Sequence, residues 1–173
     1  MNKTAFKNNK PIVLIGMMGA GKTTVGELLA KRLQLSWIDT DHHIEKVSGQ
    51  TIPEIFQNHG ENHFRQLESE ALTHSLAHFD VTSSGGGVIT IPKNIDLLKN
   101  AYVIYLKANI ETLVARLSAT DRPLLKDVDI HSKLTSLLEQ RATLYEKNSV
   151  LTVETDQLTP SQVADEIEKN LEK

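Results

Sequence analysis

Short apolar runs alternate with amphipathic stretches along the chain. The apolar runs at 11–16, 36–38, 81–84, 102–106 and 150–153 have the length and composition of strands. Because each run is separated from the next by residues with helical spacing of apolar positions, the pattern favours a parallel sheet covered by helices on both faces. We therefore expect an α/β three-layer sandwich built on five parallel strands.

The helices between these strands are predicted from apolar positions that recur every three or four residues. Thr51-Ile52-Pro53-Glu54 and Thr159-Pro160-Ser161-Gln162 are capping boxes that mark two of the helix starts, and Gly60 is expected to break the first of these helices. The long polar stretch 118–129 has no strong periodicity, so we interpret it as a mobile lid. The predicted helices span about 24–33, 51–58, 61–79, 92–100, 109–117, 131–147 and the residues from 159 onward.

The most informative stretch directly follows the first strand. Residues 16–23 read Gly-Met-Met-Gly-Ala-Gly-Lys-Thr, which fits the phosphate-loop pattern of Gly, four residues, then Gly-Lys-Ser/Thr. The glycines free the backbone so that successive N–H groups can face an anion. Lys22 adds a mobile positive charge, and Thr23 can offer its hydroxyl to magnesium. The helix that begins at Thr24 would direct its positive end at the phosphates, so the sequence predicts a nucleotide site.

Composition narrows the class of protein. The 173 residues, 39% hydrophobic and 24% charged, suit one globular domain, and the net charge of −3 gives no sign of binding to nucleic acid or to a membrane surface. There are no cysteines, which excludes disulfides and thiolate metal sites. No apolar run approaches the ~20 residues of a membrane span, and the residues up to Lys10 lack a signal-peptide core. We expect a monomer in the cytoplasm.

The second candidate site is Asp39-Thr40-Asp41 at the end of the second strand, where open parallel sheets place ligand groups. One aspartate could face magnesium through water while the other faces an acceptor hydroxyl. The alternative is a turn that also caps the following helix, because Asp favours both positions.

Two arginines stand on or beside apolar helix faces. Arg141 has Leu137, Leu138, Leu144 and Tyr145 at three and four positions away, where a charge is costly unless an anion meets it. That anion is either a buried Asp or Glu of the chain or a substrate carboxylate or phosphate held by two hydrogen bonds. Arg65 poses the same question, and Glu68, one turn further on, is placed to hold its side chain.

These motifs together resemble the shikimate kinase family. The phosphate loop is shared by many families, and the Asn-Lys-x-Asp pattern of GTPases is missing. In family order and spacing there follow Asp39-Thr40-Asp41, Phe64-Arg65-Gln66-Leu67-Glu68, Gly85-Gly86-Gly87, Arg122-Pro123-Leu124-Leu125, and Arg141 ahead of Leu144-Tyr145. This set is much more specific, and the resemblance covers about residues 12–160.

The resemblance implies the fold of a P-loop kinase and the transfer of the ATP γ-phosphoryl group to the 3-hydroxyl of shikimate, in aromatic amino-acid biosynthesis. It implies one domain, 1–173, with an acceptor-binding helical segment at about 41–79 and the lid at about 118–129. The implied ligands are shikimate, ATP and Mg²⁺. Lys22, Asp41 and Arg122 would be catalytic, with Asp41 on the acceptor hydroxyl and Arg122 on the phosphates.

The remaining implied roles concern binding. Asp39, through water, and Thr23 would hold magnesium. Asp41, Arg65, Arg141 and the backbone of Gly86 and Gly87 would hold shikimate. Gln157 stands in the loop that borders adenine in the family, where an arginine is sometimes found. The implied nucleotide-binding residues are Gly19, Ala20, Gly21, Lys22, Thr23, Thr24, Arg116, Arg122 and Gln157.

Two other functions compete with this interpretation. A gluconate-type small-metabolite kinase shares the loop and the size, but it has no need for paired arginines beside the Asp-x-Asp and triple-glycine sites. A catalytically inactive nucleotide-binding regulatory module is disfavoured by the presence of Lys22, Asp41 and both arginines. The histidine pairs His59 with His63 and His74 with His78 have a spacing that can bind metal on a helix, yet no third ligand is evident and we interpret them as solvated polar faces.

Overall fold

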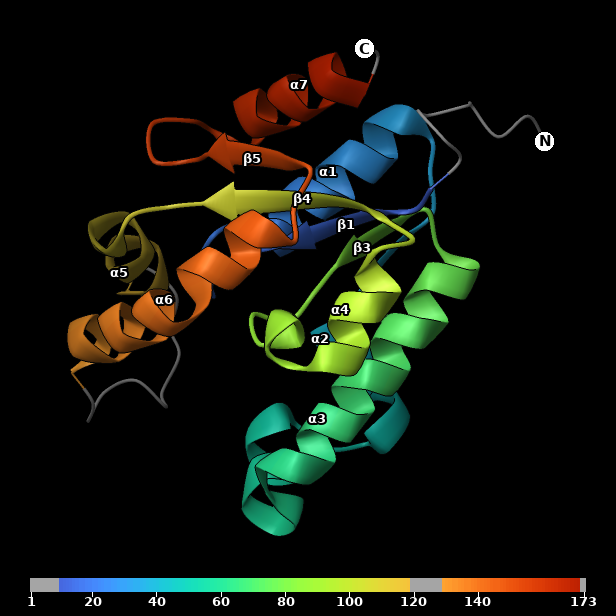
Figure 1. Cartoon of the computed structure of the whole chain (residues 1–173), viewed down its shortest axis with the longest axis vertical. Helices are drawn as coiled ribbons and strands as arrows, with labels where there is room; N and C mark the ends of the chain where they lie inside the picture. Colours follow the sequence, from blue (N-terminus) through green and yellow to red (C-terminus); the bar gives the residue numbers. More distant parts are fainter. Residues whose placement is uncertain (1–9, 119–128, 172–173) are drawn as a thin grey trace.

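The computed structural model describes residues 10–118 and 129–171 of the chain. Five strands, all parallel to their neighbours, form one sheet in the order β2-β3-β1-β4-β5 (Figure 1). The predicted parallel sheet is thus confirmed. The strands are β1 (Ile12–Ile15), β2 (Trp37–Asp39), β3 (Val81–Ser83), β4 (Tyr102–Lys107) and β5 (Leu151–Glu154).

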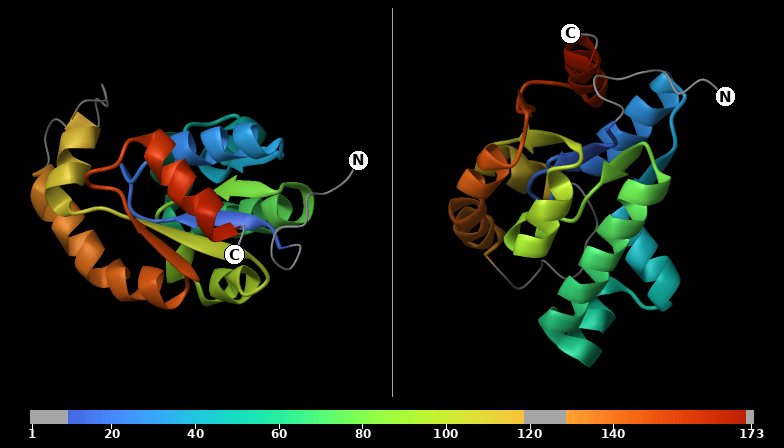
Figure 2. Two further views of the ribbon diagram at one scale, coloured as in Figure 1. Left: turned by 90° about the horizontal axis from the view of Figure 1, so that it is seen from above. Right: turned by 45° about the vertical axis from the view of Figure 1, so that its right-hand side comes forward.

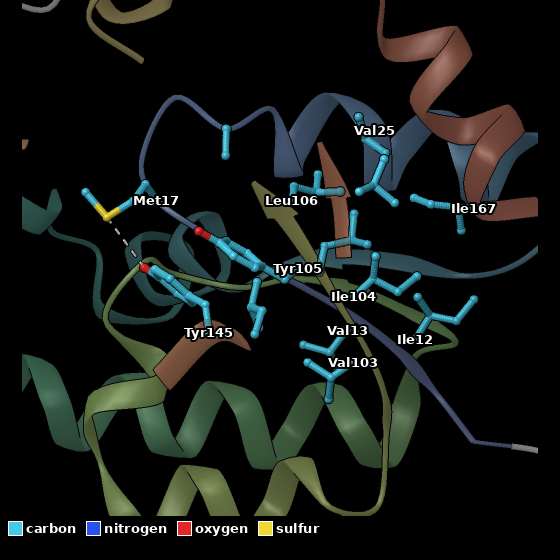
Figure 3. Packing of buried hydrophobic residues seen from close by; sticks show 14 of the residues in the cluster. Ile12, Val13, Met17, Val25, Val103, Ile104, Tyr105, Leu106, Tyr145 and Ile167 are labelled. Atoms are coloured by element: carbon cyan, nitrogen blue, oxygen red, sulfur yellow. Dashed lines mark hydrogen bonds between the residues drawn. The ribbon is translucent and has the colours of Figure 1, made fainter. Parts of the chain in front are cut away.

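The central strands are apolar along their whole length because both faces of the sheet are covered. Every residue of β1 is buried, and Val13 pairs in register with Val103 of β4. Figure 3 shows Ile104 and Leu106 pointing to the face that carries Val25, whereas Val13, Val103 and Tyr105 point to the opposite face. The core therefore lies on both sides of β1 and β4.

Helices cover the sheet on both faces, as predicted. α1 and α7 pack together on one face, while α3 and α4 lie on the other (Figures 1 and 2). The helices are α1 (Lys22–Leu33), α2 (Thr40–Ser48), α3 (Ile52–His78), α4 (Pro92–Leu98), α5 (Ile110–Ser118), α6 (Ile130–Lys147) and α7 (Pro160–Leu171), with a short 3₁₀ helix η2 (Val88–Thr90). None of these helices in the described part of the chain is long and apolar enough to cross a membrane.

The local signals read from the sequence also form. Thr51 caps α3 in a reciprocal capping box with Glu54, and Thr159 makes the equivalent hydrogen bonds with Gln162 at the start of α7. Gly60 interrupts α3 with a non-helical backbone, φ 81° and ψ 173°. The predicted break is therefore a kink between two helical halves.

Two elements differ from the prediction. The second strand ends at Asp39, and α2 begins at Thr40, so Asp39-Thr40-Asp41 spans the junction of a strand and a helix. α2 has only nine residues and begins directly where β2 ends, so no loop marks its start in the sequence. The 3₁₀ helix η2 after the triple glycine was not predicted either. Of the predicted lid, residues 119–128 lie outside the described residues.

Parallel strands place all their carboxyl ends at one edge of the sheet, where open α/β folds bind ligands. The loop 16–21 follows β1, Asp39 ends β2, and Gly85-Gly86-Gly87 follows β3 after one residue. Since β3 lies between β1 and β2, the three motifs that are far apart in the sequence meet at this edge.

Candidate active site

The loop between β1 and α1 has the backbone that an anion requires. Gly16, Gly19 and Gly21 have φ values of 143°, 82° and 94°, a region that other residues rarely adopt. A Cβ on Gly16 would lie 2.6 Å from the carbonyl oxygen of Leu106. Gly21 caps α1 without any side-chain hydrogen bond, and the first turn of α1 holds no acidic residue. The positive end of α1 is therefore open to an anion.

Lys22 is folded back over this loop. Its side chain is buried, and Nζ donates to the carbonyl oxygens of Gly16 and Met17, each at 2.8 Å. These bonds hold the ammonium group against the start of the loop. The N–H groups that would bind an anion belong to the residues that follow in the same loop. Ser83 anchors the other side of the residue, because its Oγ donates to the Lys22 carbonyl at 2.7 Å.

The two residues assigned to magnesium from the resemblance lie in direct contact. Thr23 Oγ1 donates to Asp39 Oδ2 at 2.6 Å, and Asp39 Oδ1 accepts from the N–H groups of Asp41 and His42 at 3.0 and 3.2 Å. Asp39 therefore caps α2 as well as facing the loop. The two alternatives of the sequence, a ligand site and a helix cap, are compatible in one side chain.

Asp41 stands next to this pair with an incomplete hydrogen-bond set. Its Oδ1 is buried and has no hydrogen-bond partner among the described residues. Burial, together with the charge of Asp39, raises the pKa of Asp41, while Lys22 opposes this shift. A buried carboxylate oxygen without a partner costs free energy unless a ligand supplies a donor. Asp41 is thus placed to receive a hydroxyl.

Gly85 makes room for two acidic groups. A Cβ at this position would lie 2.8 Å from Asp41 Oδ1 and 2.7 Å from Glu68 Oε1. Glu68 Oε1 is also buried without a hydrogen-bond partner among the described residues. The Gly85 N–H is itself bound, because it donates to Thr40 Oγ1 at 3.0 Å. The triple glycine therefore lies against the acidic groups of α2 and α3.

Arg65 is held by two carboxylates of its own helix. Nη1 donates to Glu68 Oε2 at 2.8 Å, and Nη2 donates to Glu61 Oε1 at 3.0 Å. Glu68 is the partner expected from the sequence, and Glu61 is an additional one. Burial raises the pKa of the Glu68 carboxyl, while the bond to Arg65 opposes that rise. The guanidinium also packs closely on Gly87, where a Cβ would come within 2.0 Å of Nη1.

Arg141 has a different environment from Arg65. No carboxylate lies within ion-pair distance of it in the part of the chain that the structure describes. Nη1 donates to the Gly86 carbonyl at 3.4 Å, and the guanidinium also interacts with the hydroxyl of Tyr145. The structural alternative, a buried acidic partner, is therefore not observed among these residues. Arg141 is half-buried, charged and weakly bound, which leaves its guanidinium able to accept an anion.

The other residues predicted to bind the nucleotide differ in their surroundings. Arg116 donates to Thr155 Oγ1 at 3.0 Å and to the Thr155 carbonyl at 2.7 Å, and it lies 3.4 Å from the Ala20 carbonyl. It therefore ties the loop 155–158 to the phosphate loop. Gln157 and Thr24 are exposed. Arg122 lies outside the described residues.

Several of these contacts were not found from the sequence. Thr40 to Gly85 and Arg116 to Thr155 join residues that are distant in the chain, so no local pattern indicates them. Tyr145 donates its hydroxyl to the Gly86 carbonyl at 2.5 Å. Its position one turn after Arg141 on the same helix was the signal that could have placed it near the site. Glu61, four residues before Arg65, fits the helical ion-pair spacing that identified Glu68.

The four histidines of the two predicted pairs all lie on α3. His59, His63 and His78 are exposed, and His74 stacks on His43 with ring centroids 4.7 Å apart. Within residues 10–118 and 129–171, no three acidic, histidine or cysteine side chains are grouped so as to hold a metal ion.

The fold and the site together define a P-loop kinase of a small metabolite. A model of the family described as shikimate kinase matches residues 18–172. The chain belongs to the shikimate kinase family.

Known proteins of this family are similar over nearly the whole chain. A shikimate kinase from Caldicellulosiruptor bescii is 44% identical, over 91% of this chain and 93% of that protein. One from Microcystis aeruginosa is 42% identical, over 96% of this chain and 90% of that protein. Among solved structures, the shikimate kinase from Acinetobacter baumannii in complex with shikimate has a TM-score of 0.88 at 38% identity, covering 94% of this chain and 93% of that chain.

Proposed function

We propose that this chain transfers the γ-phosphoryl group of ATP to the 3-hydroxyl of shikimate, giving shikimate 3-phosphate and ADP. The observation that carries the proposal is the buried Asp41 Oδ1, which lacks a hydrogen-bond donor among the described residues and stands beside the phosphate loop. A ligand hydroxyl would supply that donor, and a ligand carboxylate would meet Arg141. Shikimate carries both groups.

The nucleotide would be held by the loop that follows β1. The N–H groups of Gly19, Ala20 and Gly21 and the start of α1 would bind the phosphates, with Thr24 in the first turn. Lys22 would exchange one of its bonds to the loop carbonyls for a phosphate oxygen. Arg116 and Gln157 would border adenine, and Arg122 would approach the phosphates from the lid.

Magnesium fits the donor set formed by Thr23 and Asp39. Because the Thr23 hydroxyl donates its hydrogen bond to Asp39 at 2.6 Å, the lone pairs of Oγ1 stay available to a cation. Both Asp39 oxygens already accept hydrogen bonds, so this carboxylate would act through a bound water. When bound, the ion would neutralise charge on the phosphates and hold them in line.

The acceptor would bind between the glycine loop and α3. Asp41 would accept the proton of the 3-hydroxyl and orient the oxygen, a role that suits a carboxylate whose pKa is raised by burial. Arg65 and Arg141 would hold the carboxylate of shikimate, and the backbone of Gly86 and Gly87 would donate to it.

The chemistry demanded of the protein is mainly positioning and positive charge. The transition state of phosphoryl transfer is loose, with charge spread on the oxygens of the transferred group. Lys22 would stabilise that charge from within the loop, and Arg122 from the lid. Asp41 would align the attacking oxygen. Closure of the lid would exclude water, which otherwise competes as an acceptor.

We further propose that residues 1–173 act as one domain, as a monomer in the cytoplasm, with the acceptor held by 41–79 and the lid formed by 118–129. One sheet and one main core, to which residues of α1, α6 and α7 all contribute, support the single domain.

One assay tests the activity against its rivals. ADP release is coupled to a spectroscopic signal and compared with shikimate, with gluconate and with no acceptor. Rapid release that depends on shikimate is the expected result. ADP release that depends on gluconate would favour the gluconate-type kinase. If neither shikimate nor gluconate stimulates ADP release, only nucleotide binding or a different acceptor remains.

A further inference from the structure

The Gly86 carbonyl is held by two side chains of α6. Tyr145 donates its hydroxyl to this oxygen at 2.5 Å, and Arg141, one turn earlier on the helix, approaches the same oxygen at 3.4 Å. The tyrosine bond is much the shorter of the two. Arg141 can therefore leave the carbonyl for an acceptor carboxylate without leaving a buried oxygen unpaired.

Tyr145 is itself fixed in place. It is fully buried, and its ring stacks on Tyr105 of β4 with centroids 4.9 Å apart (Figure 3). Its hydroxyl lies 3.8 Å from Met17 Sδ, in the phosphate loop. Burial raises the pKa of Tyr145 to about 12, so the hydroxyl keeps its single proton at ordinary pH. That proton goes to the Gly86 oxygen, which is the nearer and stronger acceptor.

Holding this carbonyl also fixes the N–H group on the other side of the same peptide unit. Because the peptide is planar and trans, the Gly87 N–H points opposite to the Gly86 C=O. Neither the Gly86 N–H nor the Gly87 N–H has an acceptor within the described residues. Gly87 lies directly against the Arg65 guanidinium of α3, so fixing this peptide unit fixes a free N–H group in the residue that borders α3.

The Gly86 backbone passes close to the phosphate loop. A Cβ on Gly86 would lie 3.4 Å from the Gly16 carbonyl oxygen and 3.6 Å from the Met18 nitrogen. The Gly86 backbone thus runs between the phosphate loop and α6. Glycines, however, resist rotation of their peptide units weakly, so a hydrogen bond from a rigid side chain is needed to select one orientation.

We infer that Tyr145 is a positioning residue for the acceptor: its hydroxyl locks the Gly86-Gly87 peptide so that the Gly87 N–H is presented beside Arg65 and Arg141 is released to bind. This role rests on the proposed transfer to shikimate. It assigns to the stacked tyrosine pair two separate tasks, since Tyr105 supplies packing and only Tyr145 acts on the site.

The test compares Tyr145→Phe with Tyr105→Phe in the full-length protein. Both changes remove one hydroxyl and keep the stacked rings. Initial rates of ADP release are measured over shikimate and ATP concentrations, and melting temperatures are recorded for both variants. For Tyr145→Phe we expect the KM for shikimate to rise about tenfold, with kcat and the KM for ATP within about twofold of the parent. For Tyr105→Phe we expect both KM values within about twofold.

A second measurement separates positioning from stability. Titration calorimetry with shikimate should show the same loss of affinity for Tyr145→Phe without any nucleotide present. If Tyr145→Phe lowers the melting temperature but leaves the KM for shikimate unchanged, or if Tyr105→Phe changes that KM equally, Tyr145 only packs and the inference is wrong. If the parent protein itself shows no release that depends on shikimate, the proposed function fails, and the inference fails with it.

Discussion

The phosphate loop and the acceptor side of the site are built in opposite ways. The loop is one continuous stretch, and its lysine bonds the carbonyls of the same stretch, Gly16 and Met17. The acceptor side is assembled from α2, α3, α6 and the glycines after β3. Among the described residues it contains two buried carboxylate oxygens without partners, Asp41 Oδ1 and Glu68 Oε1, whereas the loop contains none.

This difference assigns different functions to the two halves. A backbone cradle with satisfied side chains is preorganised for phosphate, which many nucleotides carry. Buried polar atoms that lack partners are costly, and only a ligand with matching groups removes that cost. Such a site discriminates strongly against ligands that lack those groups. We therefore expect changes in the loop to lower turnover, and changes at the arginines and glycines of the acceptor side to alter shikimate binding selectively.

The largest effect is expected at Lys22. Lys22→Ala removes the positive charge nearest the transferred group, so kcat should fall about a thousandfold. Far-UV circular dichroism should be unchanged, because the loop conformation is carried by its glycines. Turnover close to that of the parent would show that the loop lysine does not stabilise the transition state.

The next largest effect tests the carboxylate that links the two halves. Asp41→Asn keeps the size and one acceptor oxygen but cannot take a proton, so kcat should fall about a hundredfold or more. Shikimate affinity, measured by calorimetry, should change much less. Retention of most of the parent kcat would mean that Asp41 only binds the hydroxyl.

The two arginines sharpen the comparison within the acceptor side. Arg141 has no carboxylate partner among the described residues, so its guanidinium can hold the ligand. Arg141→Lys should therefore raise the KM for shikimate about tenfold, because an ammonium group cannot form the planar pair of hydrogen bonds. Arg65→Lys should in addition reduce the free energy of unfolding by about 1 kcal/mol, since it weakens the pair with buried Glu68. Equal losses of ATP and shikimate affinity would point to a structural role for either residue.

A smaller effect is expected where the backbone meets Arg65. A Cβ on Gly87 would lie 2.0 Å from Arg65 Nη1, so Gly87→Ala should displace the guanidinium, which is the far end of a flexible side chain. We expect the KM for shikimate to rise about fivefold, as loss of one hydrogen bond would cause, with the KM for ATP unchanged. Gly49→Ala, at a helix C-cap glycine outside the site with φ 69°, controls for the strain of replacing a glycine, and it should lower stability while leaving both KM values unchanged.

The contrast between the loop and the acceptor side also explains which features could be predicted from the sequence. The strand-loop-helix context of residues 16–23, the capping boxes and the strands depend on residues that are neighbours in the chain, and these structural predictions are confirmed. The junction at Asp39 shows the limit. Its sequence allowed a ligand site or a helix cap, and only the hydrogen bonds of the folded chain showed that Asp39 caps α2 while its other oxygen contacts Thr23 beside the loop.

The acceptor side depends on contacts that no local pattern contains. The pair formed by Thr40 and Gly85, and the bond from Tyr145 to Gly86, exist because separate elements converge at the edge of the sheet. The sequence indicated that Arg65 and Arg141 both needed an anion. It could not indicate that Arg65 has two internal carboxylates, Glu61 and Glu68, while Arg141 has none among the described residues. That distinction depends on how α3 and α6 pack in the fold.

The smallest expected effect lies on α2, which carries Asp41 on its first turn and His43 just beyond it. His43 is half-buried beside a cavity of about 480 Å³ whose lining includes His59, His63, Glu70 and His74. Burial, with smaller contributions from His74 and Lys46, lowers the pKa of His43 from its ordinary value of 6.5. The folded state therefore prefers neutral His43. Its contribution to stability is present above pH 6.5 and is lost as the pH falls through the lowered pKa.

The effect of His43 on the pH dependence of stability can be measured only as a difference between variants. The pKa values of Asp41 and Glu68 are raised in the folded state, so their protonation on acidification favours folding and opposes the effect of His43. We compare the free energy of unfolding at about pH 7.5 and pH 5.5 by urea denaturation for the parent, His43→Gln and His42→Gln, the last being the exposed neighbour. The parent should lose more stability on acidification than His43→Gln, by a few tenths of a kcal/mol given solvent screening. His42→Gln should follow the parent. If His43→Gln also follows the parent, the stacked histidines do not couple α2 to pH, and the acceptor side is affected by acid only through its carboxyl groups.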